Sequence, residues 1–162
     1  MSTQPEIIAS STCAFWPRVA IVVSRFNEVI TDALLQGALD RFEAVGMPLD
    51  RITVVQVPGA VEIPTALQQL ANKGIFHGLI ALGAVVYGET PHFDYVCQWV
   101  TSGCQRIALD RQIPVIFGVL TTNTQEQALA RVGGHKGHMG IEAADALLAM
   151  VSVIEKVQAI AE

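Results

Sequence analysis

Charged residues are scarce in this sequence of 162 residues: Asp, Glu, Lys and Arg make up 15%, against about 25% in a typical soluble domain. Hydrophobic residues make up 51%, which excludes an intrinsically disordered chain. So few charges leave little to cover the surface of a monomer. We therefore expect part of the surface to be buried against other copies of the chain.

The sequence also lacks a basic patch: its 10 Lys and Arg residues are scattered, and the net charge is −5. Nucleic acids and anionic membranes are therefore not expected as partners. The longest stretch without charged side chains, residues 74–88, is too short to cross a bilayer. The first basic residue is Arg18, and Glu6 precedes it, so we predict no secretory signal and expect a cytoplasmic protein.

Cysteines are few, and Cys13, Cys97 and Cys104 form no CxxC pair, which favours reduced thiols. Cys97 and Cys104 are seven residues apart on one helical face, where core packing is favoured over nucleophilic chemistry. The motifs of serine hydrolases, P-loop NTPases and zincins are absent. His135 and His138 have no carboxylate or cysteine immediately beside them, so we predict no metal site.

The sequence does have a regular alternation of strand and helix patterns. Apolar, β-branched runs predict strands buried on both faces, and apolar residues at helical spacing predict helices between them. The predicted strands are 18–24, 51–57, 78–86 and 113–120, and the predicted helices are 31–45, 62–73, 91–111, 125–131 and 141–158, with a turn at 133–140. This order favours one α/β domain over residues 1–162: a three-layer α/β/α sandwich with a four-stranded parallel sheet.

Local signals indicate where these helices begin and end. Thr31 is a candidate N-cap, and Gly46 follows the end of the same helix. Pro64 suits the first turn of the second helix. Thr124 and Gln127 have the spacing of a capping box at the start of the short fourth helix.

Parallel sheets bind ligands beyond the carboxyl ends of their strands. The segments that follow the predicted strands, residues 25–27, 58–62, 87–92 and 121–123, should therefore line one rim. They bring together an aromatic ring, a carboxylate, a glycine-bearing turn and a histidine. This set predicts a pocket for a small, polar, ring-containing ligand.

The segment Gly-Glu-Thr-Pro-His at residues 88–92 is the most informative of these. Thr90 fits an N-cap and Pro91 the first helical position, so free amides at the helix start suit a phosphate. The positive helix end favours a neutral His92 that can transfer protons. The Glu89 carboxylate would repel a phosphate unless its side chain points away and only its backbone faces the site. An ordinary capped helix with an exposed histidine is the alternative interpretation.

Other residues near the rim have two interpretations each. Glu62, at a helix start, either stabilises the helix or accepts hydrogen bonds from ligand hydroxyls and ring N–H groups. Phe26 is either part of the core or a stacking platform for a flat heterocycle. Arg131 is either a favourable cation at a helix end or a phosphate clamp.

Six segments carry a resemblance to a known family. They are VVSRFN at 22–27, VPGAVEIP at 57–64, ALGAVV at 81–86, HFDYV at 92–96, PVIFGVLTT at 114–122 and EQALAR at 126–131. In this order, across residues 18–157, they resemble the lumazine synthases of riboflavin biosynthesis. The resemblance implies a flavodoxin-like fold and condensation of 5-amino-6-(D-ribitylamino)uracil with 3,4-dihydroxy-2-butanone 4-phosphate to 6,7-dimethyl-8-ribityllumazine. It implies a transferase that uses no metal or organic cofactor.

The resemblance also implies a role for each matching position. His92 would be the catalytic residue, transferring protons during imine formation, phosphate elimination and ring closure. The substrate-binding residues would be Phe26 stacked on the pyrimidine; Ala60, Val61 and Glu62 on the ring and ribityl chain; Ala84, Val85 and Val86 through their backbone; Glu89, Thr90 and Arg131 on the phosphate; and Phe117.

Family membership would also imply partners. The site of a lumazine synthase lies between neighbouring subunits of a pentamer, so we expect a homo-oligomer built from pentamers. The other expected partners are the two small-molecule substrates and riboflavin synthase. Residues 1–17 would form an N-terminal arm that pairs with a neighbouring subunit through Ile7 and Ile8. The sequence does not distinguish a pentamer from a decamer or a larger capsid.

Two departures from the family pattern lie in the phosphate half of the site. Many bacterial members have Arg-Gly-Ala or Arg-Gly-Gly where this chain has Tyr-Gly-Glu at 87–89, and Asn-Lys-Gly where it has His-Met-Gly at 138–140. Lys136, three residues before Met139, is a candidate replacement for the missing lysine. Two alternatives to an active enzyme follow: a paralogue that binds flavin or lumazine with little turnover, and a shell-forming protein.

Overall fold

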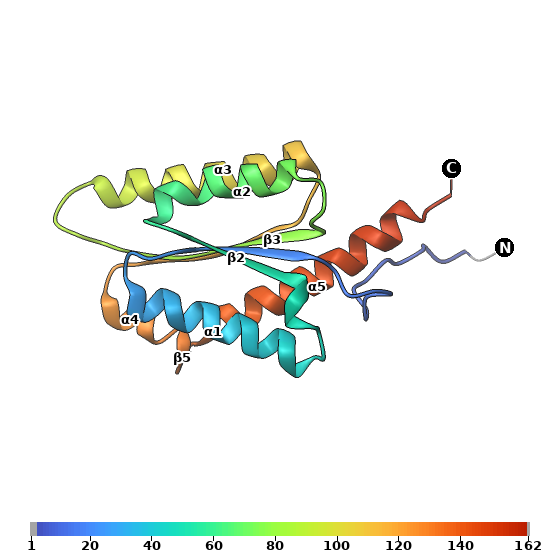
Figure 1. Ribbon diagram of the computed structural model, residues 1–162, viewed down its shortest axis with the longest axis horizontal. Coiled ribbons are helices and arrows are strands. Elements are labelled where there is room, and N and C mark those ends of the chain that lie inside the picture. Colours follow the sequence, from blue (N-terminus) through green and yellow to red (C-terminus); the bar gives the residue numbers. More distant parts are fainter. Residues whose placement is uncertain (1–2, 162) are drawn as a thin grey trace.

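A four-stranded parallel sheet with strand order β2-β1-β3-β4 forms the centre of the computed structural model, which describes residues 3–161 (Figure 1). Its strands are β1 (Val19–Ser24), β2 (Ile52–Val57), β3 (Gly78–Val86) and β4 (Val115–Thr122). The main helices are α1 (Glu28–Ala44), α2 (Ile63–Asn72), α3 (His92–Arg111), α4 (Gln125–Leu129) and α5 (Met139–Gln158). The predicted three-layer α/β/α sandwich is confirmed.

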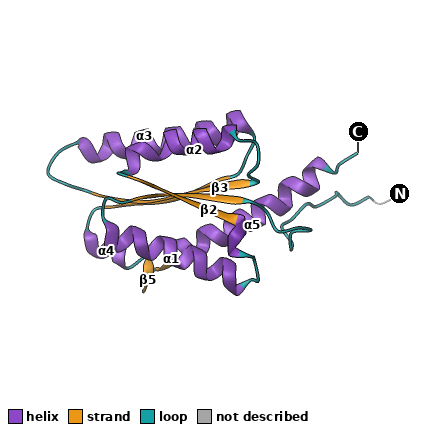
Figure 2. Ribbon diagram, viewed as in Figure 1, coloured by secondary structure: helices purple, strands orange, loops and turns teal. Residues whose placement is uncertain are grey.

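Helices cover both faces of the sheet. Figures 1 and 2 show α2 and α3 on one face and α1, α4 and α5 on the other. β1 is buried along its whole length, as is β3 up to its last residue. A strand that packs helices on both sides needs apolar side chains at every position, which explains the unbroken hydrophobic runs in the sequence.

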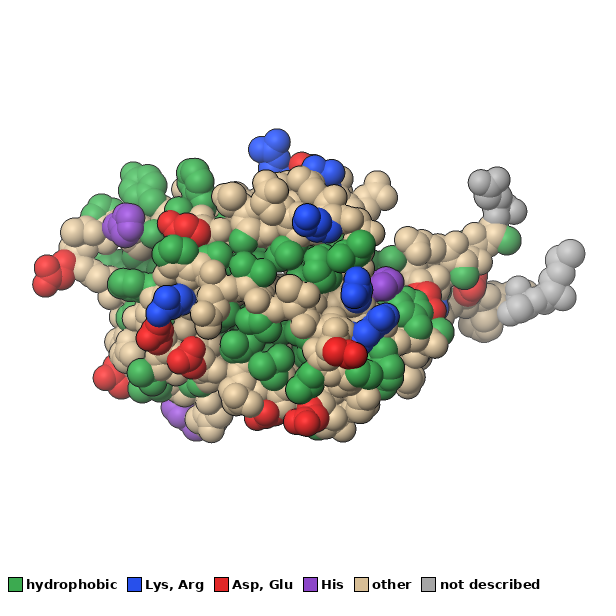
Figure 3. All heavy atoms as spheres, viewed as in Figure 1, with side chains coloured by type: hydrophobic (Ala, Val, Ile, Leu, Met, Phe, Trp, Pro, Cys, Tyr) green, Lys and Arg blue, Asp and Glu red, His purple; other side chains and the backbone are tan. Residues whose placement is uncertain are grey.

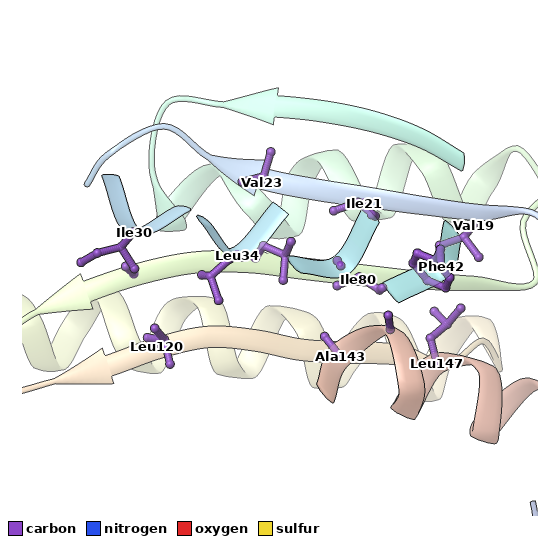
Figure 4. Close-up of a cluster of buried hydrophobic side chains, with 14 of the residues drawn as sticks. Val19, Ile21, Val23, Ile30, Leu34, Phe42, Ile80, Leu120, Ala143 and Leu147 are labelled. Atoms are coloured by element: carbon purple, nitrogen blue, oxygen red, sulfur yellow. The ribbon is translucent and has the colours of Figure 1, made fainter. Parts of the chain in front are cut away.

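The larger core cluster lies between the sheet and helices α1 and α5 (Figure 4). Val19, Ile21 and Val23 of β1 alternate onto this face, as side chains along a strand must. Leu34 of α1 and Leu147 of α5 are fully buried against it. Each such side chain contributes about 1.5–3 kcal/mol through its removal from water.

Helix α1 begins at Glu28, earlier than the sequence predicts, and the assignment of Thr31 as its N-cap is wrong. The cap position is taken by Asn27, in the left-handed region at φ 64°. Its carbonyl accepts from the amides of Ile30 and Thr31, and Thr31 is buried inside the helix. Asparagine tolerates this backbone conformation better than most residues do, so the turn from β1 into α1 is tight.

The predicted cap at Thr124 is confirmed, since Thr124 Oγ1 accepts from the Gln127 amide at 3.1 Å, whereas Gln127 Oε1 accepts from the amide of Asn123, one residue before the cap. The segment predicted as a turn at 133–140 is instead a small hairpin of β5 (Val132–Gly134) and β6 (Gly137–His138). It leads directly into α5, which begins at Met139 because His138 Nδ1 accepts from the Gly140 amide at 3.1 Å.

The described part of the N-terminal arm, residues 3–17, packs beside α5 of its own chain. The Ser11 amide donates to Ser152 Oγ at 3.1 Å, and Lys156 Nζ donates to the Ala9 carbonyl at 2.6 Å. Residues 1–2 of the arm lie outside the described residues. Pairing of the arm with a neighbouring subunit stays a prediction.

Over residues 3–161, none of the helices combines the length and the apolar character needed to span a bilayer. The longest helices, α3 and α5, both carry charged residues along their length.

Candidate functional site

A cavity of about 320 Å³ opens at the carboxyl ends of β1 and β3. These strands are neighbours, but the chain continues from β1 to β2 on one side and from β3 to β4 on the other. Doubly wound proteins bind ligands in the crevice at such a switch point. The cavity is lined by Phe26, Asn27, Gly59, Ala60, Val61, Glu62, Ala84, Val85, Val86, Gly88, Thr90, His92, Phe93 and Val96.

Phe26 and Asn27 form the wall contributed by the loop after β1. The Phe26 amide donates to the Pro58 carbonyl at 3.0 Å, and Asn27 Nδ2 donates to the Ala84 carbonyl at 2.9 Å. The loop is therefore tied to the ends of both neighbouring strands. Phe26 itself is 72% exposed, which excludes a role in the core and leaves its ring available for stacking.

A short 3-10 turn, η2 (Ala60–Glu62), forms the second wall. The Glu62 amide donates to the Gly59 carbonyl at 3.2 Å, which closes the turn. A Cβ atom at Gly59 would lie 3.1 Å from Glu62 Oε2, so the carboxylate lies back over the glycine. Glu62 is exposed and is the only acidic side chain that lines the cavity within the described residues.

The end of β3 and the start of α3 form the third wall. His92 is the first residue of α3, and its amide makes a long contact of 3.4 Å with Thr90 Oγ1. Phe93 follows it into the cavity and packs edge-to-face on Tyr87, with 5.3 Å between ring centroids. The first turn of a helix presents backbone N–H groups that have no partner within the helix, an arrangement that suits an anion.

The thiols near this wall are not poised for nucleophilic chemistry. Burial, with a smaller effect from the Asp94 carboxylate, raises the pKa of Cys97. Burial raises the pKa of Cys104 to about 12. Both thiols therefore stay protonated at neutral pH, as core cysteines do. Within residues 3–161, no three His, Cys, Asp or Glu side chains gather closely enough to hold a metal ion.

Three predicted site residues do not line the cavity. Glu89 lies on the exposed loop before α3. Phe117 lies on β4, the edge strand, and is 37% exposed. Arg131 follows α4 on the opposite face of the sheet from α3, and its Nη1 donates to the Gln127 carbonyl at 2.7 Å (Figure 1). The segment at 121–123 ends beside β3, since the Tyr87 amide donates to the Thr122 carbonyl at 2.8 Å, but it does not line the cavity within one protomer.

The hairpin before α5 explains two of the residues that depart from the family pattern. His138 caps α5, and its ring packs against Gly37 so closely that a Cβ there would overlap it. Met139 is half-buried against the core of the α1 and α5 face. Lys136 is exposed near the tip of the hairpin, where its amide donates to the Ala130 carbonyl at 2.9 Å, one residue before Arg131.

The cavity contains two residues to which the sequence analysis gave no role at all, Phe93 and Val96. Val96 follows His92 by one helical turn, so the position of His92 on the rim would have predicted it. Phe93 could not be found in this way, because an adjacent helical residue normally points about 100° away.

The fold and the cavity together define a doubly wound α/β protein with a cavity at its switch point, the place where such folds bind ligands. The family described as 6,7-dimethyl-8-ribityllumazine synthase matches residues 17–155. The chain belongs to this family.

Individual relatives agree with the family match. A 6,7-dimethyl-8-ribityllumazine synthase of Salinibacter ruber is 52% identical over 141 residues, which cover 87% of this chain and 90% of the relative. A protein of the same name from Coxiella burnetii is 47% identical over 141 residues, with 87% and 93% covered. Identity at this level over nearly the whole domain places the chain among enzymes of riboflavin biosynthesis.

Proposed function

We propose that this chain condenses 5-amino-6-(D-ribitylamino)uracil with 3,4-dihydroxy-2-butanone 4-phosphate to form 6,7-dimethyl-8-ribityllumazine. The observation that carries the proposal is the cavity at the switch point, where Phe26, Glu62 and His92 meet in a member of this family. The volume of about 320 Å³ is at the small end of the range for ligand sites. It suits a single pyrimidine ring better than a dinucleotide.

The pyrimidine half of the site is complete in one protomer. The exposed ring of Phe26 stacks on the flat heterocycle, and the backbone of Ala84–Val86 offers hydrogen bonds to the ring edge. The η2 turn, which contains Ala60 and Val61, lies beside the ribityl chain. The Glu62 carboxylate accepts hydrogen bonds from the ribityl hydroxyls. This arrangement holds the reacting amino group of the pyrimidine inside the cavity.

His92 is the proton-transfer residue in this proposal. Imine formation, loss of phosphate and ring closure all move protons between nitrogen, oxygen and carbon atoms of the bound substrates. Imidazole is the side chain best suited to that exchange near neutral pH. Its position at the start of α3, in the wall between the pyrimidine pocket and the Thr90 loop, places it where both substrates meet.

The phosphate half of the site is completed by a neighbouring subunit. The loop carrying Glu89 and Thr90 supplies backbone amides, whereas Arg131 and Phe117 of the same protomer lie away from the cavity. A ring of subunits related by head-to-tail contacts would bring these two residues to the next protomer's cavity. The proposal therefore includes a homo-oligomer built from pentamers, with sites between subunits.

The surface supports such an assembly. Figure 3 shows apolar side chains across the middle of one face, with acidic and basic groups scattered around them. Val54 on the edge strand β2, Val29 on α1 and Tyr95 on α3 are all exposed.

We place the enzyme in the cytoplasm and regard riboflavin synthase as its partner in the pathway.

A second candidate function is binding of flavin or lumazine with little turnover. The features that favour it are Glu89, which adds an anion to the phosphate half, and Met139, which stands where the family resemblance places a lysine. The pyrimidine half would be unaffected by both changes. Ligand binding without catalysis is the expected behaviour of such a protein.

One experiment separates the two functions. Purified protein is mixed with both substrates, and lumazine formation is followed by absorbance against the spontaneous condensation. A rate well above the spontaneous one supports the enzyme. A rate equal to it, together with quenching of flavin fluorescence on binding, would overturn the proposed activity in favour of the binder.

A further inference from the structure

Trp99 connects an exposed surface of α3 to the wall of the cavity. Its side chain is largely exposed, at 61%, yet its indole Nε1 donates a hydrogen bond of 3.0 Å to the Val61 carbonyl. Val61 is the middle residue of the η2 turn and lines the cavity. Trp99 does not line the cavity itself, so it acts on the site through the backbone of this turn.

The close packing of α3 on α2 explains how the indole reaches η2. Gly103 lies one helical turn after Trp99, and a Cβ atom at Gly103 would lie 2.5 Å from the Pro64 side chain. A larger residue would push the two helices apart. Val100 and Cys104 are buried and hold the adjacent face of α3 against the core. With the helices this close, the indole Nε1 reaches across to the Val61 carbonyl in the turn before α2.

The η2 turn spans only Ala60–Glu62, and short 3-10 turns have poorer hydrogen-bond geometry than α-helices. Its own bonds run from the Glu62 amide to the Gly59 carbonyl and from the Ile63 amide to the Ala60 carbonyl. Neither bond uses the Val61 carbonyl, which the Trp99 indole binds from outside the turn. A turn held at its middle carbonyl keeps both the backbone and the Glu62 carboxylate in place.

We propose that Trp99 is a positioning residue that sets the affinity for the ribityl-bearing pyrimidine. The inference rests on the proposed function, because it assigns the η2 turn to that substrate. Loss of the indole N–H frees the turn and weakens the pyrimidine complex, whereas the contacts to the phosphorylated ketone are made elsewhere. The Michaelis constant for the pyrimidine should therefore rise about fivefold, the effect of one net hydrogen bond, with kcat and the constant for the ketone nearly unchanged.

The chain offers a matched control, since Trp16 is its other tryptophan. Trp16 lies in the arm just before β1, at the opposite edge of the sheet from the cavity, and its carbonyl accepts from Arg51 Nη2. The experiment compares wild type, Trp99→Phe and Trp16→Phe. A fourth protein carries benzothienylalanine at position 99, which keeps the shape of the indole and removes only the N–H. Both Michaelis constants, kcat and the mass in solution are measured for each.

The expected result for Trp99→Phe and the benzothienyl protein is a rise in the Michaelis constant for the pyrimidine alone. Trp16→Phe should keep the wild-type constants, and all four proteins should have the same mass in solution. Equal changes in both constants, no change at all, or an altered mass for the position-99 proteins would overturn the inference. An altered mass would mean that the indole serves subunit contact. Failure of the proposed function is distinguishable, because it would show as no lumazine formation by the wild type.

Discussion

The side-chain amide of Asn27 donates a hydrogen bond of 2.9 Å to the carbonyl of Ala84. This bond joins the loop after β1 to the end of β3, across the switch point where the order of the strands reverses. Asn27 also adopts a left-handed backbone and accepts from the first amides of α1. The backbone of Asn27 thereby caps the start of α1, and its side chain holds the loop that carries Phe26 beside the cavity.

Replacing Asn27 separates these effects. Asn27→Ala removes the hydrogen bond and places a Cβ-bearing residue without local compensation in the left-handed region, which costs about 1–2 kcal/mol. Asn27→Gly removes the bond but accepts the backbone conformation. In urea unfolding, Asn27→Ala should therefore be less stable than Asn27→Gly, and both less stable than wild type. Equal stabilities of Asn27→Ala and wild type would contradict the structural role.

His92→Ala should lower kcat by a factor of about 10²–10⁴, the usual contribution of a positioned acid–base group. Binding of the pyrimidine should change much less, because Phe26 and the η2 turn still hold it. Steady-state kinetics with a separate binding titration gives both numbers. His77→Asn, at the amino ends of the strands, is the control and should leave kcat unchanged. An equal loss of turnover and affinity in His92→Ala speaks against proton transfer.

Lys136→Met tests whether this lysine replaces the one absent at Met139. Lys136 is exposed near the tip of the hairpin, and its amide is bonded to the residue before Arg131. Its charge therefore belongs to the same region as the proposed phosphate clamp. The variant should raise the Michaelis constant for the phosphorylated ketone several-fold and leave that for the pyrimidine unchanged. Wild-type values for both turnover and substrate affinity would refute the replacement.

His77 makes stability sensitive to acid. Its Nδ1 accepts from the Arg18 amide at 2.9 Å, which requires an unprotonated nitrogen. Burial, followed by the charge of Arg51, lowers the pKa of His77. The unfolded chain therefore takes up the proton first as the pH falls. The stabilisation by neutral His77 is complete at a pH above its pKa in the unfolded chain, about 6.5. It is lost as the pH falls through the lower pKa of His77 in the folded protein.

The matched variant for this prediction is His77→Asn, whose Oδ1 can accept from the same amide at every pH. Urea unfolding between pH 7.5 and pH 5 should show a decline in the free energy of unfolding for wild type that is smaller in the variant. Parallel curves for the two proteins would show that His77 does not carry the pH dependence.

The strands could be predicted because burial on both faces leaves a local signal. β1 and β3 read as unbroken apolar runs, and their observed bounds differ from the prediction by no more than one residue. The start of α1 could not be predicted, since the cap at Asn27 depends on the Ala84 carbonyl from a distant strand. The β5 and β6 hairpin was missed for a different reason. Its strands are short, and its glycines Gly133 and Gly137 take positive φ angles that resemble an ordinary turn.

In the candidate site, too, features set by neighbouring residues could be predicted, and contacts between distant segments could not. Residues that follow β1, β2 and β3 could be placed on one rim because parallel strands end together. The contact between Trp99 and Val61 could not, because it depends on the approach of α3 to α2 at Gly103. The distance of Phe117 and Arg131 from the cavity is likewise a property of the folded protomer.

In the proposed enzyme, one protomer contributes His92 and its neighbour contributes Arg131 to a single lumazine-forming site. The direct measurement is lumazine formation by a co-assembled mixture of His92→Ala and Arg131→Ala chains, with the ketone well below its Michaelis constant. The account predicts that about a quarter of the sites regain both residues, so the mixture is faster than the mean of the separate variants. A rate equal to that mean would contradict a shared site.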